Sequence, residues 1–128
     1  MSRYSVTFCL ALLACSSSTT PSDPVWGKQP CDHCHMLLSE PRTAAQLVTI
    51  RGDRRYFDDV GCLVEHLATH GAEVARAWVR DARGQWVEAQ RANYRGAEAT
   101  PMGYGFVVDE RGSIDFARVQ REVARRAP

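Results

Sequence analysis

Hydrophobic and polar positions along the chain first predict a β-hairpin followed by a helix. Residues 44–50 and 54–57 are rich in apolar, β-branched and aromatic side chains, and they flank the turn-forming pair Gly52-Asp53. From residue 60 the apolar side chains recur at i, i+3, i+4 and i+7, which is the period of an amphipathic helix. We expect Asp58 or Asp59 to cap this helix and His70-Gly71 to end it.

The second half of the chain has shorter apolar runs separated by turns. It predicts strands at 72–79, 85–87 and 106–108, and a last helix that begins at Ser113 or Asp115. That helix would bury Phe116, Val119 and Val123. The order predicts an α+β domain built from ββαβ-type units, with small antiparallel sheets and helices packed on one side.

The first residues have the pattern of an export signal. A short apolar run follows Arg3 and ends in Leu12-Leu13-Ala14-Cys15, which looks like a bacterial lipobox. We therefore expect a lipoprotein signal peptide at 1–14, a lipidated Cys15 with a flexible linker over 15–29, and a single domain over 30–128. The alternative is an ordinary signal peptide cut near Ser16. Ser16 after the cysteine, rather than Asp, favours the periplasmic face of the outer membrane.

Composition narrows the function classes. The formal net charge is +1, so nothing favours binding to nucleic acid. No pairing of a nucleophile with a base suggests an enzyme. No apolar run after residue 14 is long enough to cross a bilayer, so we expect attachment through lipid.

The candidate chemistry lies in the soft sulfur ligands. Without the signal peptide and Cys15, three of the five cysteines remain, which cannot form a closed set of disulfides. Two are in the stretch CDHCHM, which spans residues 31–36 and also contains a methionine. The candidate ligands, all in short polar or glycine-rich motifs or at a helix start, are Cys31, Cys34, Met36, Cys62 and Met102.

The predicted first helix carries a second hint. Cys62 falls in its first turn, where the helix dipole stabilises a thiolate, and roughly opposite the apolar stripe, so we expect it to lie outside the core. His66 is one turn further along the same face. For His66 and His70 we favour a solvated helix face without function.

The stretch CDHCHM is compatible with four kinds of site. C-x-x-C-H is the attachment motif of a c-type haem, but its flanks are polar and Cys62 would be left unexplained. A thiol–disulfide enzyme using Cys31 and Cys34 would need the pair at a strand-to-helix junction. Structural zinc would take the three cysteines and a histidine. Cu(I) prefers thiolates and thioethers, and a Cu(I) site is the interpretation that accounts for all five sulfur side chains together.

Five short motifs together resemble the NosL family, the copper-chaperone lipoproteins of nitrous oxide reductase assembly. The chain is similar to that family's C-x-x-C-x-M opening, A-A-Q strand, Y-F-D-D-x-G-C block, W-x-x-D strand end and T-P-M-G-x-G motif, at residues 31–36, 44–46, 56–62, 78–81 and 100–105. Two features depart from the pattern: His35 stands where relatives often have Gly, and the segment after Val108 matches poorly.

The resemblance implies a monomeric periplasmic lipoprotein that carries one Cu(I). It implies transfer to the maturation machinery of nitrous oxide reductase, which comprises a periplasmic partner and an ABC-type membrane complex. Carried over by motif, the copper ligands are Cys34, Met36, Cys62 and Met102, with Cys31 as a further candidate. The flanking glycines of Met102 suggest a loop that presents its thioether while staying mobile.

Overall fold

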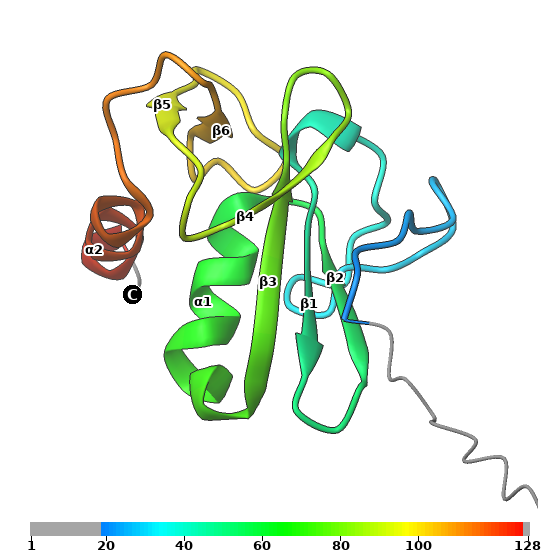
Figure 1. Ribbon diagram of the computed structural model, residues 1–128. Helices are drawn as coiled ribbons and strands as arrows, with labels where there is room; N and C mark the ends of the chain where they lie inside the picture. The colour runs from blue at the N-terminus through cyan, green and yellow to red at the C-terminus, as the bar shows by residue number, and fades with distance from the viewer. Residues whose placement is uncertain (1–18, 127–128) are drawn as a thin grey trace, which may run out of the picture.

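The computed structural model describes residues 19–126, so the signal peptide, Cys15 and residues 16–18 of the expected linker lie outside the described part. The structure is an α+β fold with two antiparallel sheets and two α-helices, as predicted (Figure 1). Its elements in chain order are η1 (Pro41–Thr43, a 3-10 turn), β1 (Ala45–Thr49), β2 (Arg54–Phe57), α1 (Val60–His70), η2 (Gly71–Glu73, a 3-10 turn), β3 (Val74–Arg80), β4 (Trp86–Glu88), β5 (Tyr94–Gly96), β6 (Phe106–Val108) and α2 (Phe116–Arg126).

The larger sheet has the strand order β2-β1-β3-β4, and every neighbouring pair is antiparallel. The predicted hairpin joins β1 to β2 through Gly52, whose φ of 91° suits glycine. Helix α1 then carries the chain across β1, so that β3 pairs with the other edge of that strand. The central position of β1 explains its nearly continuous burial.

Both helices lie on one side of this sheet, as predicted. In Figure 1, α1 runs beside β3, and α2 packs against α1 on the side away from the strands. The core between them consists of fully buried side chains from the sheet and both helices, namely Leu47, Phe57, Leu63, Val79, Val119 and Val123. Of the described helices, neither is long and apolar enough to cross a bilayer.

The opposite face of the sheet is covered by the N-terminal segment. The backbone of Ser22 exchanges two hydrogen bonds with the buried Gln46 side chain, at 3.1 and 3.0 Å. Asp23 accepts a 2.8 Å hydrogen bond from the Trp86 indole and lies 3.6 Å from the Arg80 guanidinium. The part of the expected flexible linker from Thr20 on is therefore held against the sheet, because its polar backbone finds partners there.

Two further details differ from the predicted elements, and one pair of predicted alternatives is resolved. The strand predicted at 72–79 begins at Val74, because η2 takes the residues after the helix. The short strand β5 pairs with β6 and was not predicted, since three residues carry too little pattern. Asp115 rather than Ser113 caps α2, because its carboxylate accepts a 2.7 Å hydrogen bond from the Arg118 amide.

Candidate metal centre

A tight turn brings Cys31 and Cys34 together. An isolated β-bridge between Pro30 and Leu37 closes the loop, and the Cys31 amide donates to the Met36 carbonyl at 2.8 Å. The His35 amide donates to the Cys31 carbonyl at 3.0 Å. To close the turn, His35 takes a φ of 65°, the left-handed conformation that glycine adopts most easily. The backbone of this turn therefore favours Gly at position 35, and the exposed His35 side chain is incidental to it.

The turn is fastened to the edge of the sheet by Asp32. Its amide donates to the Tyr56 carbonyl, and its carboxylate accepts from the Tyr56 amide, both at 2.8 Å. Arg55 adds an ion pair to the same carboxylate at 3.3 Å. These contacts hold Cys31 against the start of α1, which follows β2 directly.

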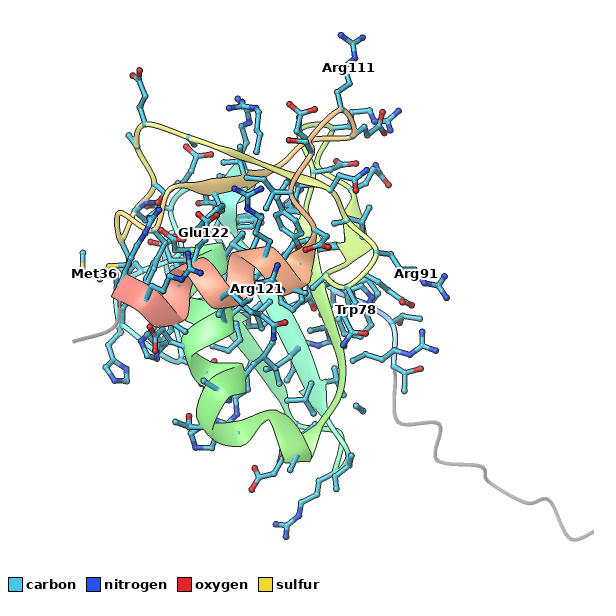
Figure 2. All side chains as sticks on the ribbon, turned by 90° about the vertical axis from the view of Figure 1, so that its left-hand side faces the viewer. Met36, Trp78, Arg91, Arg111, Arg121 and Glu122 are labelled. Carbon is cyan, nitrogen blue, oxygen red and sulfur yellow. The ribbon has the colours of Figure 1, made fainter. Side chains whose placement is uncertain are left out.

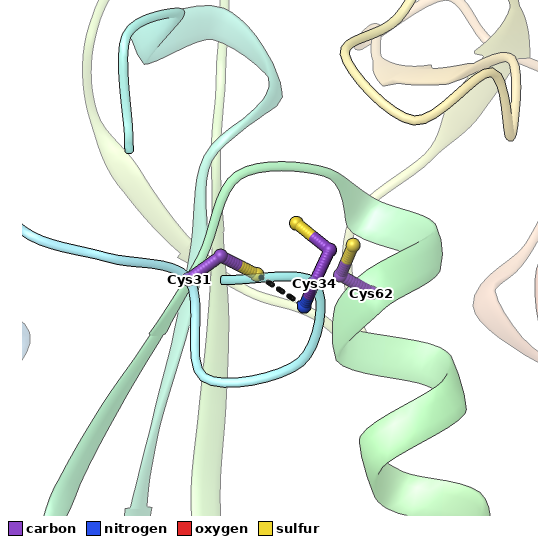
Figure 3. Close-up of side chains that lie close together, drawn as sticks. All are labelled: Cys31, Cys34 and Cys62. Carbon is purple, nitrogen blue, oxygen red and sulfur yellow. Dashed lines mark hydrogen bonds between the residues drawn. The ribbon is translucent and has the colours of Figure 1, made fainter. Parts of the chain in front are cut away.

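Helix α1 supplies the third thiol from its first turn. Asp59 caps the helix by accepting a 3.0 Å hydrogen bond from the Gly61 amide, and Cys62 follows. The Sγ atoms of Cys31, Cys34 and Cys62 all lie within 4.8 Å of one another, and the side chains converge in Figure 3. The structure thus forms a cluster that could hold a metal ion, and all three cysteines are free thiols.

Cys62 is completely buried, so the expectation that it lies outside the core is wrong. Its position on the helix was predicted correctly. However, a helical wheel shows only which side of the helix a residue occupies, and it does not show which other segments cover that side. Here the turn at 31–36 covers the side of α1 that faces away from the apolar stripe. Cys31 is equally buried, whereas Cys34 is partly exposed.

The spacing of the three sulfurs fits a small thiophilic ion. Three thiolates in a plane around an ion at about 2.3 Å lie about 4.0 Å apart. The cluster, with every pair inside 4.8 Å, needs only small side-chain rotations to reach that spacing. The Cys31 and Cys62 thiols are buried, and Cys34 is partly exposed, so the cluster reaches the surface at Cys34.

The cluster also redistributes its protons. The Cys62 thiol donates a hydrogen bond that lowers the pKa of Cys31 to about 5, and the Cys34 amide supports the same thiolate from 3.5 Å. The pKa of Cys62 is raised far above its usual value by that bond to Cys31 and by burial, and desolvation raises the pKa of Cys34. The cluster thus favours the thiolate at Cys31 and the protonated form at Cys34 and Cys62, so a metal ion that binds all three sulfurs must displace protons.

The loop of Met102 is tied to the start of the same helix. The Met102 amide donates to Asp59 Oδ2 at 3.0 Å, so the carboxylate that caps α1 also holds this loop. The Tyr104 ring lies on Gly61 so closely that a Cβ there would fall 1.9 Å from its Cγ atom. The loop backbone is thus held by a hydrogen bond and by packing at this point, and the Met102 side chain is 42 % exposed.

Of the five predicted ligands, the structure gathers the three cysteines, including Cys31. Met36 is 58 % exposed and projects from the edge of the molecule in Figure 2. Both methionines lie on segments that adjoin the cluster, Met36 on the turn of Cys31 and Met102 on the loop bound to Asp59. They are surface side chains beside a buried set of thiols.

The histidines of α1 only partly meet the expectation of a solvated face. His70 is exposed, but His66 is half-buried and its ring lies 5.2 Å from the Phe57 ring. Its spacing of four residues from Cys62 was the signal that it shares the face of the metal cluster.

Comparison with models of protein families, with curated proteins and with solved structures found no match to this chain, so its function is argued from its own residues.

Proposed function

We propose that the protein is a Cu(I)-binding metallochaperone, a member of the NosL family, that delivers copper for nitrous oxide reductase maturation. The observation that carries the proposal is the convergence of Cys31, Cys34 and Cys62 within 4.8 Å. Thiolates are the ligands that Cu(I) prefers, and a buried pair with a partly exposed third is suited to holding a soft ion near the surface. The exposed thioethers of Met36 and Met102 add soft donors beside the cluster.

Transfer of the ion would proceed by ligand exchange rather than by catalysis. Cys31 and Cys62 hold the ion from the buried side, and Cys34 faces the surface. A partner's thiolate or thioether would approach on that side and bond before the cysteines release. After release, the thiolates of Cys34 and Cys62 take back protons, which favours return of the site to its resting state.

The cellular setting of the proposal rests on the sequence. Acylation at Cys15 would attach the protein to the periplasmic face of the outer membrane. The partners would be a periplasmic protein and an ABC-type membrane complex of the maturation machinery, and the chaperone would act as a monomer.

Several features disfavour the other kinds of site. Haem attachment requires accessible thiols, but Cys31 is buried against Cys62. A thiol–disulfide enzyme attacks its substrate with an exposed thiolate, whereas the thiol with the lowered pKa is again the buried Cys31. Structural zinc requires a fourth ligand, and the three cysteines are the whole of the cluster among the described residues.

Anaerobic titration of residues 16–128 with Cu(I) in the presence of a competing chelator tests the proposal. We expect tight one-to-one binding that is weakened in Cys62→Ala and, to a smaller extent, in Met102→Leu. His35→Asn is the matched control, because Asn accepts the left-handed backbone and the exposed His35 ring is outside the cluster. Unchanged affinity in both the cysteine and the methionine variants would show that the site is wrong.

The same preparation separates the alternatives. A Soret band after expression with haem-maturation machinery would identify a cytochrome. Insulin reduction that is lost in Cys31→Ser would identify a thiol–disulfide enzyme. Retention of Zn²⁺ in preference to Cu(I) would identify a structural zinc site.

A further inference from the structure

Helix α1 carries side chains of types that can bind metal ions at three successive turns of one face. Cys62, His66 and His70 are four residues apart, so they lie one above the other along the helix. Cys62 belongs to the thiol cluster, but the two histidines have no part in it. Their rings stack on each other, with centroids 4.4 Å apart and planes inclined by 19°.

Thr69 contacts one ring nitrogen of His70. The Thr69 hydroxyl lies 3.2 Å from the His66 carbonyl, and its Oγ1 lies 2.7 Å from His70 Nδ1. With Nδ1 engaged by Thr69, Nε2 is the nitrogen that His70 offers to an ion. In metal-bound histidines the second ring nitrogen is commonly engaged by a neighbour in this way.

The two histidines open onto a surface pocket with further donors. The pocket has a volume of about 300 Å³, and His33 and Glu73 line it together with both rings. Arg55 also lines it, but its charge is paired with Asp32 at 3.3 Å. His33 comes from the turn at 31–36, so the pocket lies between that turn and α1, next to the thiol cluster but outside it.

We propose that His66 and His70, with His33 across the pocket as third ligand, form a second metal site for a divalent borderline ion such as Zn²⁺. Histidines at i and i+4 on a helix are a recurrent chelating pair for such ions. Binding would require the exposed His70 ring to turn from its stack toward the ion, and His33, also exposed, to approach from the turn at 31–36. Glu73 supplies a carboxylate within the same pocket.

The chemistry of this site is complementary to that of the thiol cluster. Imidazoles select divalent ions such as Zn²⁺, whereas a set of three thiols favours Cu(I). Burial and the neighbouring His70 lower the pKa of His66, so its ring is neutral and ready to bind at pH 7. The site does not depend on whether the cysteines carry copper.

Titration of the wild-type chain with Zn²⁺ tests the site one residue at a time. The ring nitrogens of the histidines are followed by ¹H–¹⁵N correlation spectra, and the cysteine Cβ signals report on the thiol cluster. We expect the rings of His33, His66 and His70 to shift together with one midpoint that differs from that of the cysteines, while His35 stays unchanged. Ring signals that do not move, that move together with His35, or that saturate in step with the cysteines would each overturn the proposal.

A pair of matched variants completes the experiment. His70→Asn should weaken Zn²⁺ at the imidazoles by at least about 10–100-fold, the range found when only an outer-shell partner of a bound metal is lost, and leave Cu(I) affinity unchanged. His35→Asn, the same replacement at an exposed histidine outside the pocket, should change neither. An unchanged Zn²⁺ affinity in His70→Asn would overturn the site even if the spectra shift.

Discussion

Replacing Asp59 by Asn would separate two tasks that one buried carboxylate performs. Oδ1 accepts from the Gly61 amide and so caps α1, and Oδ2 accepts from the Met102 amide and so holds the loop, each at 3.0 Å. Asn is as good a helix cap as Asp, so the cap survives the substitution. The second position then carries an amide N–H₂ group facing the Met102 N–H, so the hydrogen bond that holds the loop is lost.

The expected cost follows from burial. Asp59 is completely inaccessible to solvent, so no water replaces the missing acceptor. Losing a hydrogen bond to a charged group and leaving a buried donor unpaired costs about 2–4 kcal/mol. Domains of this size unfold with about 5–15 kcal/mol, so the variant still folds. At about 4 °C per kcal/mol, the melting temperature should fall by about 8–16 °C.

Urea unfolding of the wild type and of Asp59→Asn measures this loss of stability. The neighbouring substitution Asp58→Asn is the control. Asp58 is also buried, but its carboxyl accepts only from the neighbouring backbone amides of Ser39, at 3.3 Å, and Glu40, and burial raises the pKa of this carboxyl. An amide keeps an acceptor oxygen and removes the desolvated charge, so Asp58→Asn should change the unfolding free energy by less than about 1 kcal/mol. Equal losses in the two variants would refute the assignment of a double role to Asp59.

Three further outcomes follow from the structure. Gly61→Ala should cost about 1–3 kcal/mol in urea unfolding, because the added methyl group displaces the Tyr104 ring from the start of α1. Tyr94→Phe should cost about 1 kcal/mol at neutral pH, because the buried hydroxyl donates to the Ala89 carbonyl at 2.7 Å. Burial raises the pKa of Tyr94 far above its usual value, so its stabilisation is complete below about pH 10 and is lost as the pH rises further. In Tyr94→Phe this alkaline loss should be smaller. His35→Gly should be neutral or stabilising by up to about 1 kcal/mol, because relief of the left-handed backbone offsets the greater freedom of Gly in the unfolded chain, whereas His35→Val should destabilise.

The elements with a clear hydrophobic period were predictable, and those held by polar contacts were not. The hairpin, the helix from Val60 to His70 and its stop at Gly71 follow directly from pattern and capping residues. The docking of the N-terminal segment depends on hydrogen bonds between Ser22 and Gln46. A stretch of Ser, Thr and Pro has no periodicity, so its sequence gives no sign of the sheet face that it covers.

The cysteine cluster was partly predictable from the types of its residues. Soft ligands at two places in the chain suggested a shared metal, and the fold brings Cys31 and Cys34 to Cys62. The burial of Cys62 could not be deduced, because it depends on a turn that packs from outside the helix. The hydrogen bond between Asp59 and Met102 could not be predicted either, because capping of the helix was already a sufficient explanation for an aspartate at that position.

The docked N-terminal segment would set how far a domain anchored through Cys15 can stand from a membrane. If Cys15 carries the lipid as proposed, only residues 16–19 separate it from Thr20, whose carbonyl is bound by Arg54 at 2.6 Å. Five chain steps reach about 18 Å at full extension, little more than the radius of a domain of about 100 residues. A copper chaperone anchored in this way would be confined to a thin layer above the lipid. It would meet its partners by diffusing along the membrane surface, because the tether is too short to reach partners far from the membrane.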